Sequence, residues 1–568
     1  MTAKFAFPSI LKDLGALLAV ATASHARALA LLVLISLVSF LPGFFNIPPV
    51  DRDEARFAQA TKQMIESGDY IDIRFQDEVR YKKPVGIYWL QAGVVRAAEA
   101  VGVPQARSTI SLYRIPSLIG AIGAVLLTYL AALAFVTRRG AFLAGLMMAT
   151  CVLLNIEARL AKTDAVLLMC CVAAMGVMAR AYLTQSTGRD IPWSHALVLW
   201  TALAGGILLK GPLILMAVGA AALFLAIADR SARWLLRLRP LAGILWILVL
   251  VLPWFVAIMG RAGDSFLQES LGHDLFAKIF KGQETHGAPP GYYLLLFWLT
   301  FWPAAPLAAV AAPAIWQHRA EPPLRFLLAW VVPCWIVFEL VVTKLPHYVL
   351  PLYPAIAIMI AWAIERRALS NNPHLARFAV MWPIFAAVIP AAAVWLVLYM
   401  RGQFAWLAWP FGAMGLIFGF YAWRLYDVEG PERSLLRASL GMLLMIIATL
   451  GVAVPLMRPI FSSAALTDFV RDADCRNPMV AAAGFHEPSL VFLLGTRTRL
   501  VDGSTAAEIL RGGDCRYAIV ESRHDRAFAQ RAEQIGLRYR LRGRLENAFN
   551  YNGGRPVSFA IYRTESQR

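Results

Sequence analysis

Apolar residues in this chain fall in long uninterrupted blocks, and the segments between the blocks carry charge or proline. Each block is roughly 17 to 24 residues long, the length that a helix needs to cross about 30 Å of hydrocarbon. About thirteen such blocks can be read, centred between positions 36 and 446. The pattern predicts a mainly α, polytopic membrane protein with about thirteen transmembrane helices.

Composition supports this class, because 59% of the residues are hydrophobic and only 16% are charged. A soluble domain carries about 25% charged residues. The net charge of +18 is spread over the loops between apolar blocks. We therefore expect anionic membrane lipids, and no nucleic acid, among the partners.

Basic residues concentrate in alternate loops, which predicts the orientation of the chain. The positive-inside rule places these loops, and with them the N-terminus, in the cytoplasm. An odd number of spans then places the C-terminus outside. The loops in question carry Arg138, Arg139, Arg230, Arg233, Arg237, Arg239, Arg319, Arg325, Arg366, Arg367, Arg377, Arg424, Arg433 and Arg437.

Two long polar segments fall on the outer side. The first, about 46–111, opens with a helical pattern over 53–66 that has one apolar face and stops at Ser67-Gly68. The second, 462–568, alternates strand-like runs at 479–483, 490–494 and 517–520 with a helical stretch at 505–511. We predict a transmembrane domain over 1–461 and a small outer α/β domain over 462–568.

The six cysteines separate into two groups. Four lie inside apolar blocks, where a thiol behaves as a small hydrophobic group: Cys151, Cys170, Cys171 and Cys334. Cys475 and Cys515 belong to the outer domain and could form a disulfide in an oxidising compartment. The sequence leaves their pairing open.

Charged residues also gather where spans meet the outer face. Asp53 and Glu54 begin the helical pattern of the first outer segment, Lys83 precedes an apolar run, and Asp164 and Lys210 stand at span ends. A solvated interfacial helix and snorkelling lysines would explain each position separately. A shared site is the alternative, since clustered cations stabilise charge on a departing phosphate.

The outer loop over 261–291 contains His273 and Lys278 among other polar residues. Histidine and carboxylate groups in one loop could bind a divalent metal, but no tight ligand spacing is present. A loop of this length over a membrane site is equally suited to close over a lipid substrate. A metal is therefore possible, and no cofactor is certain.

Taken together, these motifs resemble bacterial members of the protein O-mannosyltransferase-like clan, and within it the lipid A aminoarabinose transferase family. The similarity runs in order from the first span to about residue 360. The segments that carry it are 53–58, 68–69, Lys83-Pro84 with Tyr88-Trp89, Arg159 with Asp164, 210–212 and 344–351. Residues 484–489 are similar to a segment in the C-terminal domain of related glycosyltransferases.

The resemblance implies a GT-C fold, an undecaprenyl-phosphate-linked sugar as donor, and inverting transfer to a lipid acceptor at the periplasmic face of the inner membrane. It makes Asp53 and Asp164 the catalytic carboxylates. It places Arg56, Lys83 and Lys210 at the donor phosphate, and assigns a substrate cavity or lid to Glu54, Tyr81, His273, Lys278 and Tyr348. The chain departs from the family at Lys82, where a glutamate is common, and at Phe57, where a tyrosine is common.

Other functions remain open at this point. A transferase that moves a hexose or a uronic acid to lipopolysaccharide core, another glycan or a protein would carry nearly the same loop residues. A flippase or transporter of lipid-linked sugars should instead have charges buried in mid-span and broken helices in related halves. The charges lie at span ends, which favours a transferase.

Overall fold

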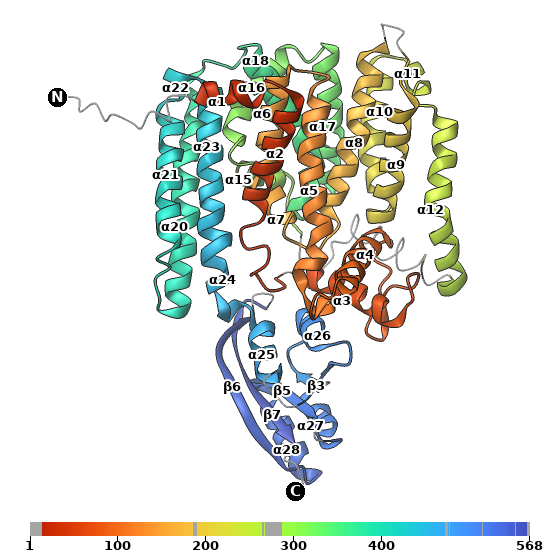
Figure 1. Ribbon diagram of the computed structural model, residues 1–568, viewed down its shortest axis with the longest axis vertical. Helices are drawn as coiled ribbons and strands as arrows, with labels where there is room; N and C mark the ends of the chain where they lie inside the picture. Colours follow the sequence, from red (N-terminus) through yellow and green to blue (C-terminus); the bar gives the residue numbers. More distant parts are fainter. Residues whose placement is uncertain are drawn as a thin grey trace, which may run out of the picture.

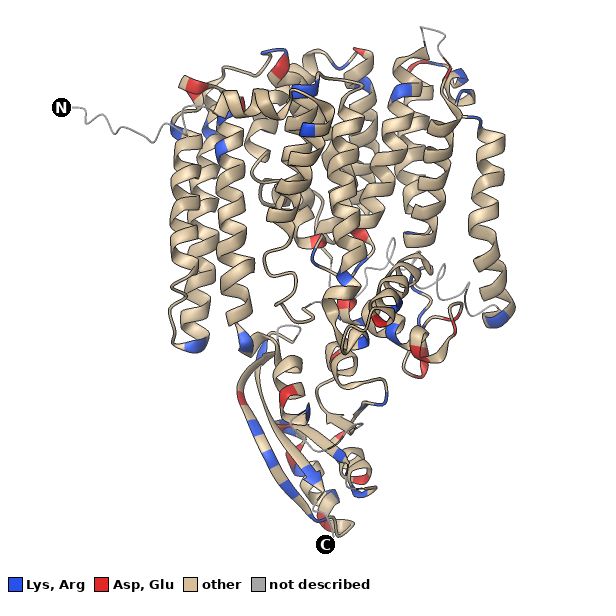
Figure 2. Cartoon of the chain, in the orientation of Figure 1, with Lys and Arg blue, Asp and Glu red and all other residues tan. Residues whose placement is uncertain are grey.

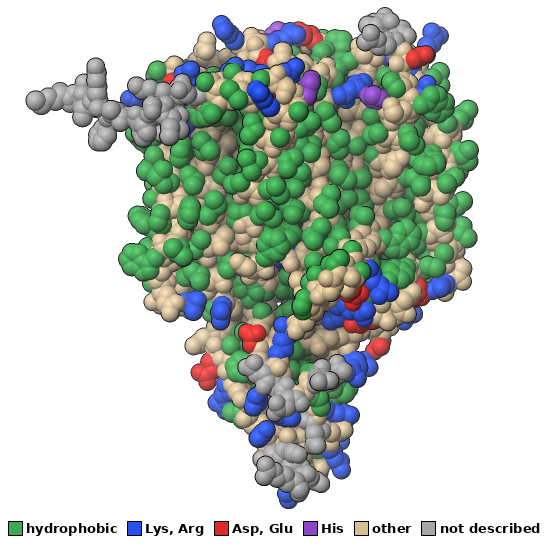
Figure 3. Space-filling view, viewed as in Figure 1, with side chains coloured by type: hydrophobic (Ala, Val, Ile, Leu, Met, Phe, Trp, Pro, Cys, Tyr) green, Lys and Arg blue, Asp and Glu red, His purple; other side chains and the backbone are tan. Residues whose placement is uncertain are grey.

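The protein consists of a large helical bundle with a small sheet domain at one end (Figure 1). The computed structural model describes residues 14–50, 52–185, 190–263, 266, 287–471, 475, 478–513, 515–550 and 553–564. Large apolar side chains cover the flank of the bundle, and charged residues gather toward its two ends (Figures 2 and 3). Such a belt is what a hydrocarbon solvent requires, so the bundle is the membrane-embedded part.

Eight helical segments of the described residues are long and apolar enough to cross a membrane, or nine if a bent pair at the start of the chain counts as one span. The bundle helices are α1 (Leu14–Ala21), α2 (His25–Phe40), α5 (Ile110–Ala132), α6 (Arg138–Ala149), α7 (Val152–Glu157), α8 (Asp164–Leu183), α9 (Trp193–Lys210), α10 (Leu213–Ala228), α12 (Pro240–Ala262), α15 (Tyr292–Thr300), α16 (Ala305–Gln317), α17 (Pro322–Leu340), α18 (Tyr353–Glu365), α20 (Met381–Arg401), α21 (Ala408–Arg424) and α23 (Pro431–Ile446).

Shorter elements connect the bundle helices or extend them. They are α11 (Arg233–Leu236), η5 (Pro346–Leu352), α19 (Pro373–Ala376), η6 (Arg377–Val380), α22 (Tyr426–Glu429), η7 (Ile447–Ala453), α24 (Val454–Leu456) and η8 (Arg458–Ile460). Each of the predicted apolar blocks is helical, which confirms the polytopic fold class. The count of about thirteen spans stays a prediction, because several of these helices are short or interrupted.

Two of the predicted blocks are broken inside the bundle. The block near residue 148 divides at Thr150 and Cys151 into α6 and α7, and the block near residue 303 divides into α15 and α16. The backbone groups at helix ends within a bundle need hydrogen-bond partners from neighbouring elements. The two breaks provide hydrogen-bond partners for each other, because the Val152 N–H donates to the Trp302 carbonyl at 3.2 Å.

The first outer segment folds into two helices joined by a small hairpin. These elements are α3 (Arg52–Ser67), β1 (Arg74–Phe75), β2 (Glu78–Val79), α4 (Gly86–Ala100) and η2 (Ala106–Ser108). Helix α3 confirms the predicted helix and its stop at Gly68, which has a φ of 72° that suits glycine. Its apolar positions Phe57, Ala60 and Met64 are buried.

The C-terminal domain is a five-stranded sheet with helices on both faces. Its elements are α25 (Ser462–Arg471), β3 (Met479–Ala483), α26 (Pro488–Leu494), β4 (Arg499–Val501), α27 (Gly503–Arg511), β5 (Arg516–Glu521), η9 (Ser522–His524), α28 (Asp525–Gln534), β6 (Tyr539–Asn550) and β7 (Arg555–Thr564). The strand order is β4-β3-β5-β7-β6; β3 runs parallel to β4 and β5, and β7 runs antiparallel to β5 and β6. The predicted small α/β domain is confirmed as a fold.

One predicted strand is wrong. Residues 490–494 form most of helix α26 and not a strand. A short apolar run carries too little periodicity to separate the two, and the flanking residues decide: Pro488 suits the first helical position, and Gly495, with a φ of 118°, ends the helix.

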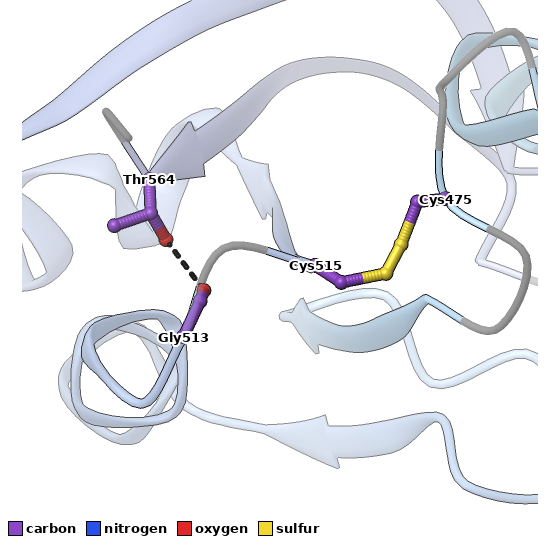
Figure 4. Close-up of a disulfide and its surroundings, with 4 residues drawn as sticks. All are labelled: Cys475, Gly513, Cys515 and Thr564. Atoms are coloured by element: carbon purple, nitrogen blue, oxygen red, sulfur yellow. Dashed lines mark hydrogen bonds between the residues drawn. A yellow bond between two sulfur atoms is a disulfide. The ribbon is translucent and has the colours of Figure 1, made fainter. Parts of the chain in front are cut away.

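Cys475 and Cys515 form a disulfide in the C-terminal domain (Figure 4). Their Cα atoms are 5.9 Å apart, and the bond closes a loop over a sequence separation of 40. Nearby, the Thr564 hydroxyl donates to the Gly513 carbonyl at 3.1 Å, which ties the end of β7 to the segment that leads to Cys515 (Figure 4). The pairing that the sequence left open is thus present.

We expect the disulfide to stabilise the C-terminal domain by about 2 to 4 kcal/mol, because it restricts the unfolded chain. Reductant should therefore lower the thermal unfolding midpoint of this domain and speed its proteolysis. The Cys475→Ser/Cys515→Ser double variant is the control, and it should be as labile without reductant as the wild type is with it. Identical protease resistance of the wild type with and without reductant would contradict the prediction.

Candidate functional site

The first group of site residues surrounds the N-terminal end of α3. Asp53 lies in the first turn of this helix, where an ionised carboxylate suits the helix dipole. Its Oδ1 is 3.6 Å from Arg56 Nη1 and 3.9 Å from Arg80 Nη2. The Asp53 side chain is 48% exposed, so this carboxylate can meet a substrate.

Glu54, the next residue, points the other way and is fully buried. Its carboxylate pairs with Arg114 of α5 at 2.7 and 3.0 Å and accepts backbone N–H groups of Val50 and Ala161, both at 3.1 Å. Both partners of the ion pair are buried. These contacts anchor α3 to the bundle, and the cavity or lid role that the sequence predicts for Glu54 stays a prediction.

The second group lies where three elements of the bundle meet. Lys210, the last residue of α9, pairs with Asp164, the first residue of α8. His347 of η5 places its Nε2 3.7 Å from Asp164 Oδ1, and the Tyr348 ring centroid is 5.5 Å from Lys210 Nζ. Gly211, with a φ of 64°, ends α9 directly after Lys210 and so fixes that lysine at the helix terminus.

Glu157, at the end of α7, extends this second group. Its Oε1 is 3.6 Å from His347 Nδ1 and 3.8 Å from Lys162 Nζ. One ligand atom from each of Glu157, Asp164 and His347 lies within 4.8 Å of the others. Two carboxylates and an imidazole could hold a divalent cation, but Lys162 and Lys210 already supply positive charge to both carboxylates. The geometry therefore fits a compact ion-pair network without requiring a metal.

The two groups share one electrostatic field. Partial loss of hydration by itself raises the pKa of the half-exposed Asp53 carboxyl, but the positive charges of Arg80 and Lys162 outweigh it and hold that pKa below its usual value. Asp53 is thus ionised at neutral pH. Lys162, which contacts Glu157 in the second group, lies close enough to bias Asp53 in the first. The structure brings Asp53, Arg56, Asp164, Lys210 and Tyr348 to one region.

Other predicted residues have different neighbours. The Lys83 ammonium donates to the Lys82 carbonyl at 2.9 Å, on the exposed side of the loop. Tyr81 is buried, and its hydroxyl donates to Asp72 at 2.8 Å. Lys344 donates to the carbonyls of Glu339 and Val341 at 2.8 and 2.6 Å, which caps the end of α17.

His273 and Lys278 lie outside the described residues, so their predicted lid role stays a prediction. Three further residues lie at the site although the sequence patterns did not single them out: Arg80, Glu157 and His347. His347 stands inside the motif over 344–351, and Arg80 lies three positions before Lys83. Glu157 ends an apolar block seven positions before Asp164, and a buried acid at such a span end is a usable signal.

A bundle of this kind, with carboxylates and cations at helix ends near a small C-terminal α/β domain, defines a polytopic membrane protein with a GT-C fold. ArnT from Cupriavidus metallidurans bound to undecaprenyl phosphate has a similar fold, with a TM-score of 0.74 and 19% sequence identity over 94% of this chain and 98% of that chain. The same protein in the apo state gives a TM-score of 0.72 at 18% identity.

Sequence comparison shows which proteins the chain resembles. Residues 82–256 match the family described as dolichyl-phosphate-mannose-protein mannosyltransferase. The undecaprenyl phosphate-alpha-4-amino-4-deoxy-L-arabinose arabinosyl transferase of Pectobacterium carotovorum is 27% identical over 66% of this chain and 67% of the relative. That of Erwinia tasmaniensis is 29% identical over 61% of each chain. The aligned region thus spans about three fifths to two thirds of these relatives, and the family resemblance inferred from the motifs is confirmed.

The buried pair of Glu54 and Arg114 yields a stability prediction. Glu54→Gln leaves the Arg114 charge buried without its counterion, so we expect a loss of about 3 to 5 kcal/mol in unfolding free energy. Thermal unfolding of the purified protein in detergent measures the loss. Glu99→Gln is the matched control, because Glu99 forms partly exposed pairs with Arg96 and Arg107, and should cost less than about 1 kcal/mol. Equal midpoints for the two variants would contradict an anchoring role.

Proposed function

We propose that this protein is a membrane glycosyltransferase that uses a polyprenyl-phosphate-linked sugar and transfers the sugar to lipid A or another envelope acceptor. The observation that supports this proposal is that two carboxylates, Asp53 and Asp164, lie close to several cations toward one end of the bundle. A donor with a lipid phosphate needs such cations at the membrane surface. The relatives, named as transferases for an undecaprenyl-phosphate-linked aminoarabinose, support the same chemistry.

In this reaction an acceptor oxygen attacks the anomeric carbon of the sugar while the bond from that carbon to the phosphate oxygen breaks. The bonding electrons leave with the phosphate, which needs no proton because its developing charge meets cations. Attack opposite the departing phosphate inverts the anomeric centre. Arg56 and Lys210 are suited to stabilise the phosphate. Lys83, in the segment between β2 and α4, is a further candidate for this role.

Asp53 is suited to orient the acceptor and to take its proton when the acceptor is a hydroxyl. Its lowered pKa favours orientation over strong base catalysis, because a carboxylate of this kind is a weak base. A phosphate acceptor would need orientation only. Asp164 keeps Lys210 in place through their ion pair and adds the second negative charge of the site.

We further propose an inner-membrane location with a cytoplasmic N-terminus and a periplasmic C-terminus. The basic residues that the positive-inside rule uses belong to the end of the bundle opposite the C-terminal domain (Figure 2). The site residues lie toward the domain end. This orientation would expose the site to lipid-linked sugars and envelope acceptors outside the cytoplasm.

The orientation can be tested with reporter fusions. A reporter that is active only in the periplasm should work when fused after Arg568 and should fail when fused after Arg237, which belongs to the basic end. A cytoplasm-specific reporter should give the complementary pattern. The reverse pattern would place the site in the cytoplasm and would exclude the proposed reaction.

The function is tested by replacing Asp53. Asp53→Asn keeps the size of the side chain but removes its charge, so we expect transfer to fall by roughly 10² to 10³ fold, comparable to the loss of a transition-state contact. Mass spectrometry of lipid A and core glycans, with and without the gene, identifies the product and measures its loss. Asp77→Asn is the control, because Asp77 is an exposed carboxylate in the same outer segment. Normal product levels from a well-expressed Asp53→Asn protein would exclude the assignment.

A further inference from the structure

Arg80 occupies an unusual position beside Asp53. It directly follows strand β2, and its backbone N–H donates to the Ile73 carbonyl at 2.8 Å, so the hairpin fixes its place. The residue is only 8% exposed. Its guanidinium carbon lies 5.2 Å from the centroid of the Phe57 ring, and Phe57 in turn packs on Tyr88 at 5.4 Å. This stacking holds the guanidinium plane in one orientation.

The hydrogen bonds of this guanidinium are incomplete. Among the described residues, no acceptor lies within hydrogen-bonding distance of the buried Arg80 Nε. The nearest carboxylate contact, from Nη2 to Asp53, is 3.9 Å and thus longer than a hydrogen bond. A buried cation with an unmet donor is costly unless an anion completes it.

Arg114 of α5 is a buried arginine whose hydrogen bonds are all made within the chain, and it serves as a comparison for Arg80. Its guanidinium donates to both oxygens of Glu54 and to the carbonyls of Phe44, Ile47 and Pro48, at distances of 2.7 to 3.1 Å. Arg80 is almost as buried, but within the described part of the chain it lacks such a set of acceptors. The contrast indicates that the acceptor for Arg80 comes from outside the described chain.

We infer that Arg80 binds the phosphate of the polyprenyl donor, an assignment that rests on the proposed function. The planar fork of a guanidinium matches two oxygens of a phosphate, and its orientation on Phe57 leaves no need to order the side chain on binding. Its position next to Asp53 puts the phosphate beside the carboxylate that orients the acceptor. Arg80 thereby adds a buried donor to a phosphate site for which Lys83, whose ammonium donates on the exposed side of the loop, had been the candidate in this segment.

The direct test measures binding of undecaprenyl phosphate, without sugar or acceptor, to the purified full-length protein. Arg80→Met should weaken the affinity about 10 to 100 fold, because a charge-assisted pair of hydrogen bonds is lost. Arg80→Lys keeps the charge but not the fork, and should lie between the wild type and Arg80→Met. Arg74→Met is the matched control, since Arg74 lies on the same hairpin and pairs with Asp72 at 2.7 Å with an exposed side chain.

The pH profile of transfer gives a second readout. Removing the Arg80 charge should raise the pKa of Asp53, because Arg80 is the largest of the charges that lower it. The acidic limb of kcat/KM, which follows ionisation of Asp53, should therefore move to higher pH in Arg80→Met. Arg56, Lys162 and His347 still face Asp53, so the limb shifts without being lost. This shift reports the charge of Arg80 beside Asp53, whereas the affinity for undecaprenyl phosphate reports the contact of Arg80 with the donor.

The outcomes separate the inference from the proposed function. Unchanged affinity for undecaprenyl phosphate in Arg80→Met overturns the inference. If Arg80→Met does not fold, Arg80→Lys decides by the same comparison with Arg74→Lys. A wild-type protein that fails to bind undecaprenyl phosphate at all overturns the proposed function itself.

Discussion

The ion pair between Glu54 and Arg114 is the contact on which the position of Asp53 depends. It joins the first turn of α3 to the membrane helix α5, and the remaining acceptors of Arg114 lie in the segment just before α3. Two buried charges are stable only with good geometry and further hydrogen bonds, and this pair has both. Because Asp53 directly precedes Glu54, a fixed Glu54 fixes the position from which Asp53 meets a substrate.

The C-terminal domain holds the other side of α3. Glu487, just before α26, pairs with Arg52 at 3.0 Å, and the buried Lys62 ammonium donates to the Phe492 carbonyl at 3.0 Å. Gln59 donates to Thr496 at 2.8 Å. Helix α3 is therefore clamped between the bundle and the sheet domain. The segment over 484–489, which is similar to a segment of related glycosyltransferases, contributes Glu487 to this contact.

Much of the fold follows from the sequence because its signals are strong. A block of apolar residues long enough to cross a bilayer has few alternatives to a helix, and the apolar face of 53–66 marks α3 clearly. Two features were not accessible in this way. The run at 490–494 is too short to show a period, and the breaks at Thr150 and near Trp302 depend on hydrogen bonds between elements far apart in sequence.

The site was predicted in part for the same kind of reason. Asp53, Asp164 and Lys210 stand at span ends, where an ionisable group is conspicuous, and the structure brings them together. The anchoring contacts of Glu54 could not be predicted, because a charge that anchors a helix and a charge that contacts a substrate look alike in the sequence. Only the direction of each side chain, which the tertiary fold sets, separates them.

The hydrogen-bond acceptors of each buried cation therefore indicate its role better than its position in the sequence does. Lys344 is buried and donates to two carbonyls at the end of α17, so its ammonium group is bound within the chain. Arg159 donates to backbone carbonyls that include Pro42 at 2.8 Å and is likewise bound within the chain. Arg80 is buried to a similar degree, but its Nε has no acceptor among the residues that the structure describes. Since an unmet buried donor is costly, a cation of this kind is expected where a ligand supplies the missing oxygen.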